Sequence, residues 1–155
     1  MSIQRITTSP QQTEQLAAEL ARRLQGGDIV TLEGPLGAGK TCFVRGLARG
    51  LGLDPGQVSS PTFAITQEYT QPNQPTLVHI DAYRLHGQDE LETIGWEELV
   101  ACESIIIALE WPSRIAAALA DLRCIEVTIE PAAQHRRIIT MSAHEDLSER
   151  LGELP

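Results

Sequence analysis

Residues 34 to 41, with the sequence GPLGAGKT, carry the strongest chemical signal in this chain. They match the pattern G-x-x-x-x-G-K-[ST], in which glycines let successive backbone N–H groups turn inward around a phosphate. Lys40 adds a full positive charge for the β and γ phosphates, and the Thr41 hydroxyl is a suitable ligand for Mg²⁺. This P-loop therefore predicts a site for a nucleoside triphosphate with Mg²⁺.

Two carboxylates at the ends of apolar runs are the best candidates to act with the P-loop. Asp81 follows the run LVHI, and Glu110 follows the run IIIAL. Phosphoryl transfer to water needs one group on the metal side and one that positions the attacking water. Either acid can fill either role, and the sequence does not divide the roles. His79 alternates onto the same strand face as Asp81, and we interpret it as a structural histidine.

Further side chains near these motifs are candidates for supporting roles. Thr62 lies in a Ser- and Pro-rich loop and resembles the small hydroxyl residues that sense a γ-phosphate in switch loops. Trp111 can either stack near the nucleotide or a partner, or pack partly buried. Arg84 and Arg114 are candidate transition-state cations, and surface or ion-pair roles are equally open for both.

A strand and a helix must position the P-loop. Residues 28–34 have the apolar character of a buried strand, and apolar residues recur with helical spacing from Phe43 to Leu51. A helix that begins near Gly39 adds free N–H groups and the positive end of its dipole to the phosphate site. Arg45 and Arg49 lie beyond its first turn, and we interpret them as a solvated helix face.

The rest of the chain alternates strands with helices. Strands are predicted at residues 3–6, 28–34, 64–70, 76–83, 105–110, 122–130 and 136–141. Helices are predicted at residues 10–24, 39–50 and 91–101 and after Pro112. The pattern predicts a single P-loop NTPase-like α/β domain over residues 1–155, with a largely parallel central sheet, antiparallel hairpins and helices on both faces.

The composition limits the classes of function. The formal net charge of −9 argues against a general basic surface that binds nucleic acid. Eleven of the twelve basic residues are arginines, and the single lysine is Lys40. No run approaches the roughly eighteen apolar residues that span a bilayer, so we expect a cytoplasmic protein without membrane contact. The three cysteines are widely spaced and predict neither a disulfide framework nor a zinc site.

Four segments, taken in order, resemble the TsaE family, also called YjeE. They are GPLGAGKT, SPTFAITQEY, HIDAYRL and LEWPSR, and the resemblance covers nearly the whole chain. It implies a domain that binds ATP with Mg²⁺ and hydrolyses it slowly unless it engages the TsaB–TsaD complex. Those partners add a threonylcarbamoyl group to the adenosine beside the anticodon in tRNAs that read codons beginning with A. Because the chain itself is acidic, we expect any contact with tRNA to come through these partners.

The resemblance also assigns roles to individual residues. Catalytic positions correspond to Lys40, Asp81 and Glu110, and Mg²⁺ positions to Thr41 and Glu110. Thr62 corresponds to a switch-like loop, and Trp111 to a tryptophan beside the metal-site acid. Nucleotide-binding positions are Gly37, Ala38, Gly39, Lys40, Thr41 and Cys42, with Ser9 and Arg136 as candidate adenine contacts.

Two P-loop residues depart from the family pattern. Pro35 stands where an acidic residue is common, and it lacks an N–H group, but the later amides of the loop form most of the cradle. Cys42 stands where a second threonine is common, so a hydroxyl toward the α-phosphate is lost and the backbone donor is kept. We expect a modest loss of nucleotide affinity and unchanged function.

Two other functions compete with an accessory ATPase. A small-molecule P-loop kinase would need an arginine-bearing lid, and no arginine-rich segment here clearly supplies one. A nucleotide-dependent binding module would use ATP only to select a conformation, and its partner could meet the seven acids of residues 85–113. The guanine-specifying pattern [TN]-K-x-D is absent, which favours ATP.

Overall fold

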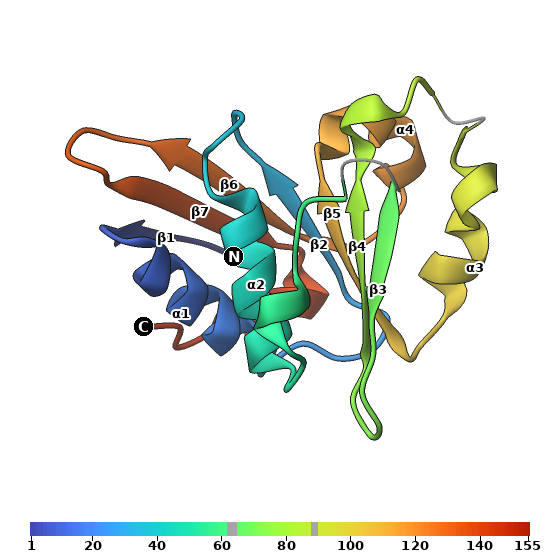
Figure 1. Cartoon of the computed structure of the whole chain (residues 1–155), viewed down its shortest axis with the longest axis horizontal. Helices are drawn as coiled ribbons and strands as arrows, with labels where there is room; N and C mark the ends of the chain where they lie inside the picture. Colours follow the sequence, from blue (N-terminus) through green and yellow to red (C-terminus); the bar gives the residue numbers. More distant parts are fainter. Residues whose placement is uncertain (62–64, 88–89) are drawn as a thin grey trace.

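The computed structural model describes residues 1–61, 65–87 and 90–155, and within them a seven-stranded sheet carries helices on both faces (Figure 1). The strands are β1 (Ser2–Thr7), β2 (Ile29–Glu33), β3 (Thr66–Tyr69), β4 (Thr76–Asp81), β5 (Ile105–Glu110), β6 (Cys124–Pro131) and β7 (Arg137–Ala143). The α-helices are α1 (Pro10–Ala21), α2 (Lys40–Gly50), α3 (Trp96–Ala101), α4 (Ala116–Leu119) and α5 (Ser148–Leu151). No helix among these residues is long and apolar enough to span a bilayer.

The centre of the sheet is parallel and its edges are antiparallel, as predicted. The strand order is β1-β7-β6-β2-β5-β4-β3. Strand β2 pairs in parallel with β5 and β6, and β4 pairs in parallel with β5. The β3–β4 and β6–β7 hairpins and the β1–β7 pair supply the antiparallel edges. The carboxyl ends of β2, β4 and β5 therefore meet at one edge, where the P-loop joins β2 to α2 (Figure 1).

Two apolar cores lie on opposite faces of the sheet, because successive side chains of a strand point to opposite sides. Leu77 and Ile106 belong to the core beneath α1 and α2. Their chain neighbours Val78 and Ile107 belong to the core beneath α3. His79 follows Leu77 by two residues, and Glu110 follows Ile106 by four, so each points to the same side of the sheet as that residue. Both side chains therefore lie on the face that carries α2 and the P-loop.

Helices α1 and α2 pack at unusually close range. A Cβ atom added at Gly46 would lie 2.4 Å from the Glu14 carbonyl oxygen and 2.6 Å from the Ala17 Cβ. A Cβ atom added at Gly50 would lie 2.3 Å from the Ala18 carbonyl oxygen. The backbones meet where α2 has no side chains, so α1 holds the P-loop helix rigidly.

Two predicted elements end early, because Ala82 and Tyr83 belong to a 3-10 helix after β4 and helix α1 ends at Ala21. Three further parts of the secondary structure differ from the prediction. The expected helix over 91–101 is interrupted at Gly95, whose φ of 69° is left-handed, and only residues 96–101 are α-helical. The segment after Pro112 begins as a 3-10 helix, Pro112–Ile115, before α4. Helix α5 was not predicted, because four residues are too short to show a helical period.

Candidate nucleotide-binding site

The P-loop has the backbone conformation that a phosphate cradle needs. Gly37 and Gly39 have left-handed φ angles of 76° and 112°, which other residues rarely adopt. A Cβ atom added at either glycine would meet nothing within 4 Å, so this stretch of backbone is open to a ligand. A Cβ atom at Gly34 would lie 2.5 Å from the Ile129 carbonyl oxygen, so only glycine fits there. Amides near these glycines and the start of α2 can therefore surround an anion.

Lys40 lies folded against its own loop and is 6% exposed. Its ammonium donates hydrogen bonds to the carbonyl oxygens of Gly34 and Pro35, the second at 3.0 Å. The same nitrogen lies 4.0 Å from the centroid of the Trp111 ring. Carbonyl dipoles and a π face hold the cation more weakly than a phosphate anion can, so Lys40 is placed to exchange these partners for phosphate oxygens.

Burial lowers the pKa of Lys40 from its ordinary value, because the charged ammonium loses water. The negative charges of Glu110, Glu33 and Asp81 act in the opposite direction without cancelling the effect. The lone lysine is thus a partly desolvated cation among acids, and an additional anion would stabilise it.

Asp81 and Glu110 lie side by side at the carboxyl ends of β4 and β5. They are direct register partners in the parallel pair, and Leu32 of β2 is the partner of Glu110 on its other side. Asp81 Oδ1 accepts a hydrogen bond from the Tyr83 amide at 3.0 Å. Burial raises the pKa of Asp81, the Tyr83 amide opposes that rise, and the Glu110 charge adds to it. The structure therefore brings together the two acids that the sequence singled out.

His79 contacts Glu110 directly, which the sequence interpretation as a merely structural histidine did not anticipate. Its Nε2 lies 3.0 Å from Glu110 Oε2, and the two side chains are 0% and 4% exposed. The contact joins residues on neighbouring strands, so only the strand register could have revealed it.

The donor set at this edge suits Mg²⁺. The Thr41 hydroxyl at the start of α2 and the carboxylates of Asp81 and Glu110 are oxygen ligands, which Mg²⁺ prefers. Across the described part of the chain, no group of three or more His, Cys, Asp or Glu residues could hold a metal ion.

Trp111 is held in a strained conformation beside the P-loop. Its φ of 61° is left-handed, and its amide donates to the Leu32 carbonyl oxygen at 3.1 Å. The Tyr83 ring lies 5.0 Å away on a tilted plane, and the Arg114 guanidinium carbon lies 5.0 Å from the Tyr83 ring centroid. One cation–aromatic stack therefore runs from the P-loop to the surface, and its members are, in order, Lys40, Trp111, Tyr83 and Arg114.

The candidate adenine contacts lie in different settings. Ser9 caps α1 by accepting from the Gln12 amide at 3.2 Å, and Cys42 Sγ lies 3.3 Å from the Pro10 carbonyl oxygen. The start of α1 is thereby placed next to the start of α2. Arg136 is exposed at the β6–β7 turn.

Arg137, the neighbour of Arg136, is the residue that reaches the P-loop. Its Nε donates to the Ala38 carbonyl oxygen at 2.8 Å. Sequence reasoning missed it because the contact joins residues 99 positions apart, and no local pattern brings the start of β7 to the P-loop. Thr62 lies outside the described residues.

Arg45 and Arg49 are ion-paired and not merely solvated. Both approach the Glu14 carboxylate of α1, at 3.4 and 2.9 Å respectively. The two side chains are 37% and 51% exposed, so the pairs are partly screened by water. They tie α2 to α1 beyond the first helical turn.

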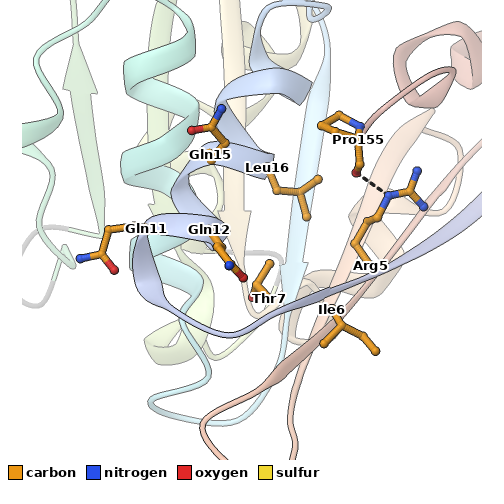
Figure 2. Close-up of a pocket in the computed structure, with 8 residues that line it drawn as sticks. All are labelled: Arg5, Ile6, Thr7, Gln11, Gln12, Gln15, Leu16 and Pro155. Atoms are coloured by element: carbon orange, nitrogen blue, oxygen red, sulfur yellow. Dashed lines mark hydrogen bonds between the residues drawn. The ribbon is translucent and has the colours of Figure 1, made fainter.

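A cavity of about 500 Å³ lies elsewhere, between β1 and α1 (Figure 2). Its walls include Ile6, Gln12, Leu16 and Pro155, and Arg5 Nε donates to the Pro155 carbonyl oxygen there. No P-loop residue lines this cavity, so it is separate from the candidate nucleotide site.

Comparisons with known proteins point to one family. A family model described as "Threonylcarbamoyl adenosine biosynthesis protein TsaE" matches residues 7–139. A "tRNA threonylcarbamoyladenosine biosynthesis protein TsaE" from Bacillus subtilis is 39% identical over 137 residues, which are 88% of this chain and 83% of that protein. One from Treponema pallidum is 35% identical over 137 residues, which are 88% of this chain and 98% of that protein. A crystal structure of Bacillus subtilis YdiB, 29% identical, superposes with a TM-score of 0.77 and covers 99% of this chain and 94% of its own.

Proposed function

The chain belongs to the TsaE family, and we propose that it is a Mg²⁺-dependent ATPase that supports threonylcarbamoyladenosine formation in tRNA. Its partner in this proposal is the TsaB–TsaD complex in the cytoplasm, and tRNA is contacted through that complex. The names of the matched relatives support the pathway. The observation that carries the ATPase is the placement of Lys40 beside Asp81 and Glu110 at one edge of the sheet.

Each group at this edge has a distinct task. The P-loop amides and Lys40 hold the β and γ phosphates, and Thr41 and Glu110 hold Mg²⁺. Mg²⁺ held there would supply charge neutralisation at the phosphates. Asp81, whose carboxylate lies beside Glu110 and accepts from the Tyr83 amide, orients the attacking water. Arg137 fixes the Ala38 peptide, so the cradle keeps its shape.

The present partners of Lys40 support slow turnover by the isolated chain, because its ammonium is held by the Gly34 and Pro35 carbonyl oxygens and by the Trp111 ring. Among the described residues, Arg114 is the arginine that the aromatic stack links to Lys40, and its guanidinium stays on the Tyr83 ring. A partner that seats on this surface can move the stack and so change the position of Lys40. We therefore expect TsaB and TsaD to raise the rate of ATP hydrolysis.

The test is ATP hydrolysis by the purified protein, with and without TsaB and TsaD. We expect slow phosphate release alone and faster release with both partners. Glu110→Gln should bind ATP and lose hydrolysis, whereas Glu130→Gln, a matched change at an exposed position of β6, should behave as wild type. Fast hydrolysis without partners would contradict the proposal.

Two further readouts separate the competing functions. Transfer of labelled phosphate from ATP to a metabolite would indicate a kinase. Repeated tRNA modification at the normal rate with Glu110→Gln, while ATP binding persists and hydrolysis is lost, would indicate a binding module in which hydrolysis is incidental.

A further inference from the structure

We infer that His79 is a positioning residue that fixes the Glu110 carboxylate toward the Mg²⁺ side of the P-loop. The inference rests on the proposed function, because it assigns His79 a part in holding the metal that ATP brings. It goes beyond that function in naming a residue that touches neither the nucleotide nor the phosphates.

The register of two parallel strands creates the contact. Asp81 of β4 lies opposite Glu110 of β5, and His79 lies two residues earlier on the same face. From there its ring reaches Glu110, with Nε2 and Oε2 at 3.0 Å. A carboxylate that ligates Mg²⁺ only accepts hydrogen bonds, so in that state Nε2 would carry the proton and donate it toward Oε2. Among the described residues, this is the one side-chain hydrogen bond of Glu110.

The second ring nitrogen of His79, Nδ1, indicates that this residue is not present for packing alone. Its Nδ1 is buried and has no hydrogen-bond partner among residues 1–61, 65–87 and 90–155. The neighbouring positions Leu77, Val78 and Ile80 are filled by buried aliphatic side chains. A buried imidazole with one unpaired ring nitrogen is less favourable for stability than an aliphatic side chain would be at this position. We therefore attribute the presence of His79 to its contact with Glu110.

Glu110 needs this support because other charges compete for its orientation. The Lys40 ammonium is close enough for the charge of Glu110 to affect its pKa, and so is the Asp81 carboxyl group. Without His79, the carboxylate would turn toward Lys40 and away from Asp81. A metal ligand that must first be reoriented binds its metal more weakly, which is the usual effect of removing an outer hydrogen-bond partner.

The decisive measurement is the affinity for ATP by calorimetry at a series of Mg²⁺ concentrations, together with thermal unfolding of each variant. We expect His79→Leu to keep its affinity for ATP without Mg²⁺ and to need about 10-fold more Mg²⁺ for the same enhancement of ATP binding. His79→Gln places an amide N–H near the position of Nε2 and should restore most of that Mg²⁺ response. Glu130→Gln is the surface control.

A second pair of variants separates positioning from a general structural role. In a Glu110→Gln background, His79→Leu should have no further effect on the Mg²⁺ response, because the group that His79 acts through is already changed. An added loss in that background, or a wild-type Mg²⁺ response in His79→Leu, would overturn the inference while leaving the proposed ATPase intact. If wild-type protein binds ATP without any Mg²⁺ enhancement, the proposed Mg²⁺ role fails and this inference fails with it.

Discussion

The two ends of helix α2 are built in opposite ways. Toward its carboxyl end, Gly46 and Gly50 bring α2 against α1 with no side chain between the backbones. At its amino end, Lys40 lies desolvated near three acids, and strained Trp111 covers it. The carboxyl end contains close backbone packing and partly exposed ion pairs, and the amino end contains a desolvated charge and a backbone angle that folding alone disfavours.

We call the region around Gly46 and Gly50 the packed end of α2 and the region around Lys40 its reactive end. The contrast between them indicates that the packed end supports the reactive end. Unfavourable burial and backbone strain persist only where the surrounding structure determines them strongly. The α1–α2 contact and the pairs from Glu14 to Arg45 and Arg49 supply that constraint within the same helix. Substitutions at the amino end should therefore change activity more than stability, and substitutions at the packed end should do the reverse.

The largest effect is expected from Lys40. Lys40→Met removes the phosphate-contacting cation and should lower partner-stimulated ATP hydrolysis about 100- to 1000-fold, as removal of a transition-state donor does. Thermal stability should not fall, because burial already disfavours the ammonium. Lys40→Arg should also impair ATP binding or hydrolysis, since a planar guanidinium cannot replace a compact ammonium that lies 4.0 Å from the Trp111 ring centroid.

Arg49→Met is the matched control for Lys40→Met, because it removes a cation from the exposed face of the same helix. Its rate of hydrolysis should remain close to that of wild type. Near-normal hydrolysis by Lys40→Arg would show that a point-charge contact is not required, and that the single lysine of this chain is an accident of composition.

The second effect tests the packed end. Gly46→Ala adds a Cβ at 2.4 Å from the Glu14 carbonyl oxygen, so α1 and α2 must move apart. We expect a loss of about 1–3 kcal/mol in the free energy of unfolding, even though alanine favours a helix more than glycine does. Urea unfolding measures it, and Gly152→Ala, where an added Cβ would lie 3.6 Å from the Glu149 carbonyl oxygen, is the control. Equal stability of Gly46→Ala and wild type would mean that the interface tolerates expansion.

Sequence reasoning was strongest where the signal is local. The P-loop, its flanking strand and helix, and the acids at strand ends follow from residues close together in the chain, and the structure places them in one region. The contact between His79 and Glu110 and the reach of Arg137 to Ala38 depend on register between distant strands. A shift of one residue would move such a side chain to the other face of the sheet, so these contacts could not be predicted from the sequence alone, and Arg136 stays a candidate adenine contact.

The third effect tests the start of α1, where it lies beside the reactive end of α2. Ser9 Oγ accepts from the Gln12 amide, while the Gln12 side chain accepts from the Thr8 amide at 2.7 Å. Ser9→Ala should cost about 1 kcal/mol of stability by removing this cap. Ser9→Asp, which can still accept from Gln12, should retain most of it in the same thermal unfolding assay. If ATP affinity falls in both variants while Ser9→Asp keeps its stability, the Ser9 hydroxyl also contacts the nucleotide.

The smallest effect concerns the pH dependence that Asp81 gives to stability. Burial raises the pKa of Asp81 above its ordinary value of 3.8, so just above that pH the folded state binds more protons than the unfolded state. The contribution of Asp81 to stability therefore falls as pH rises through that window, and it stays unfavourable at neutral pH. Asp81→Asn keeps an oxygen that can accept from the Tyr83 amide but cannot ionise, so its stability relative to wild type should rise between pH 3.5 and pH 7. The difference should be small because the carboxyl group is only partly buried and is screened by water. A relative stability that falls over the same interval would show that the Tyr83 amide and Lys40 outweigh burial, and that the reactive end is less strained than the comparison with the packed end implies.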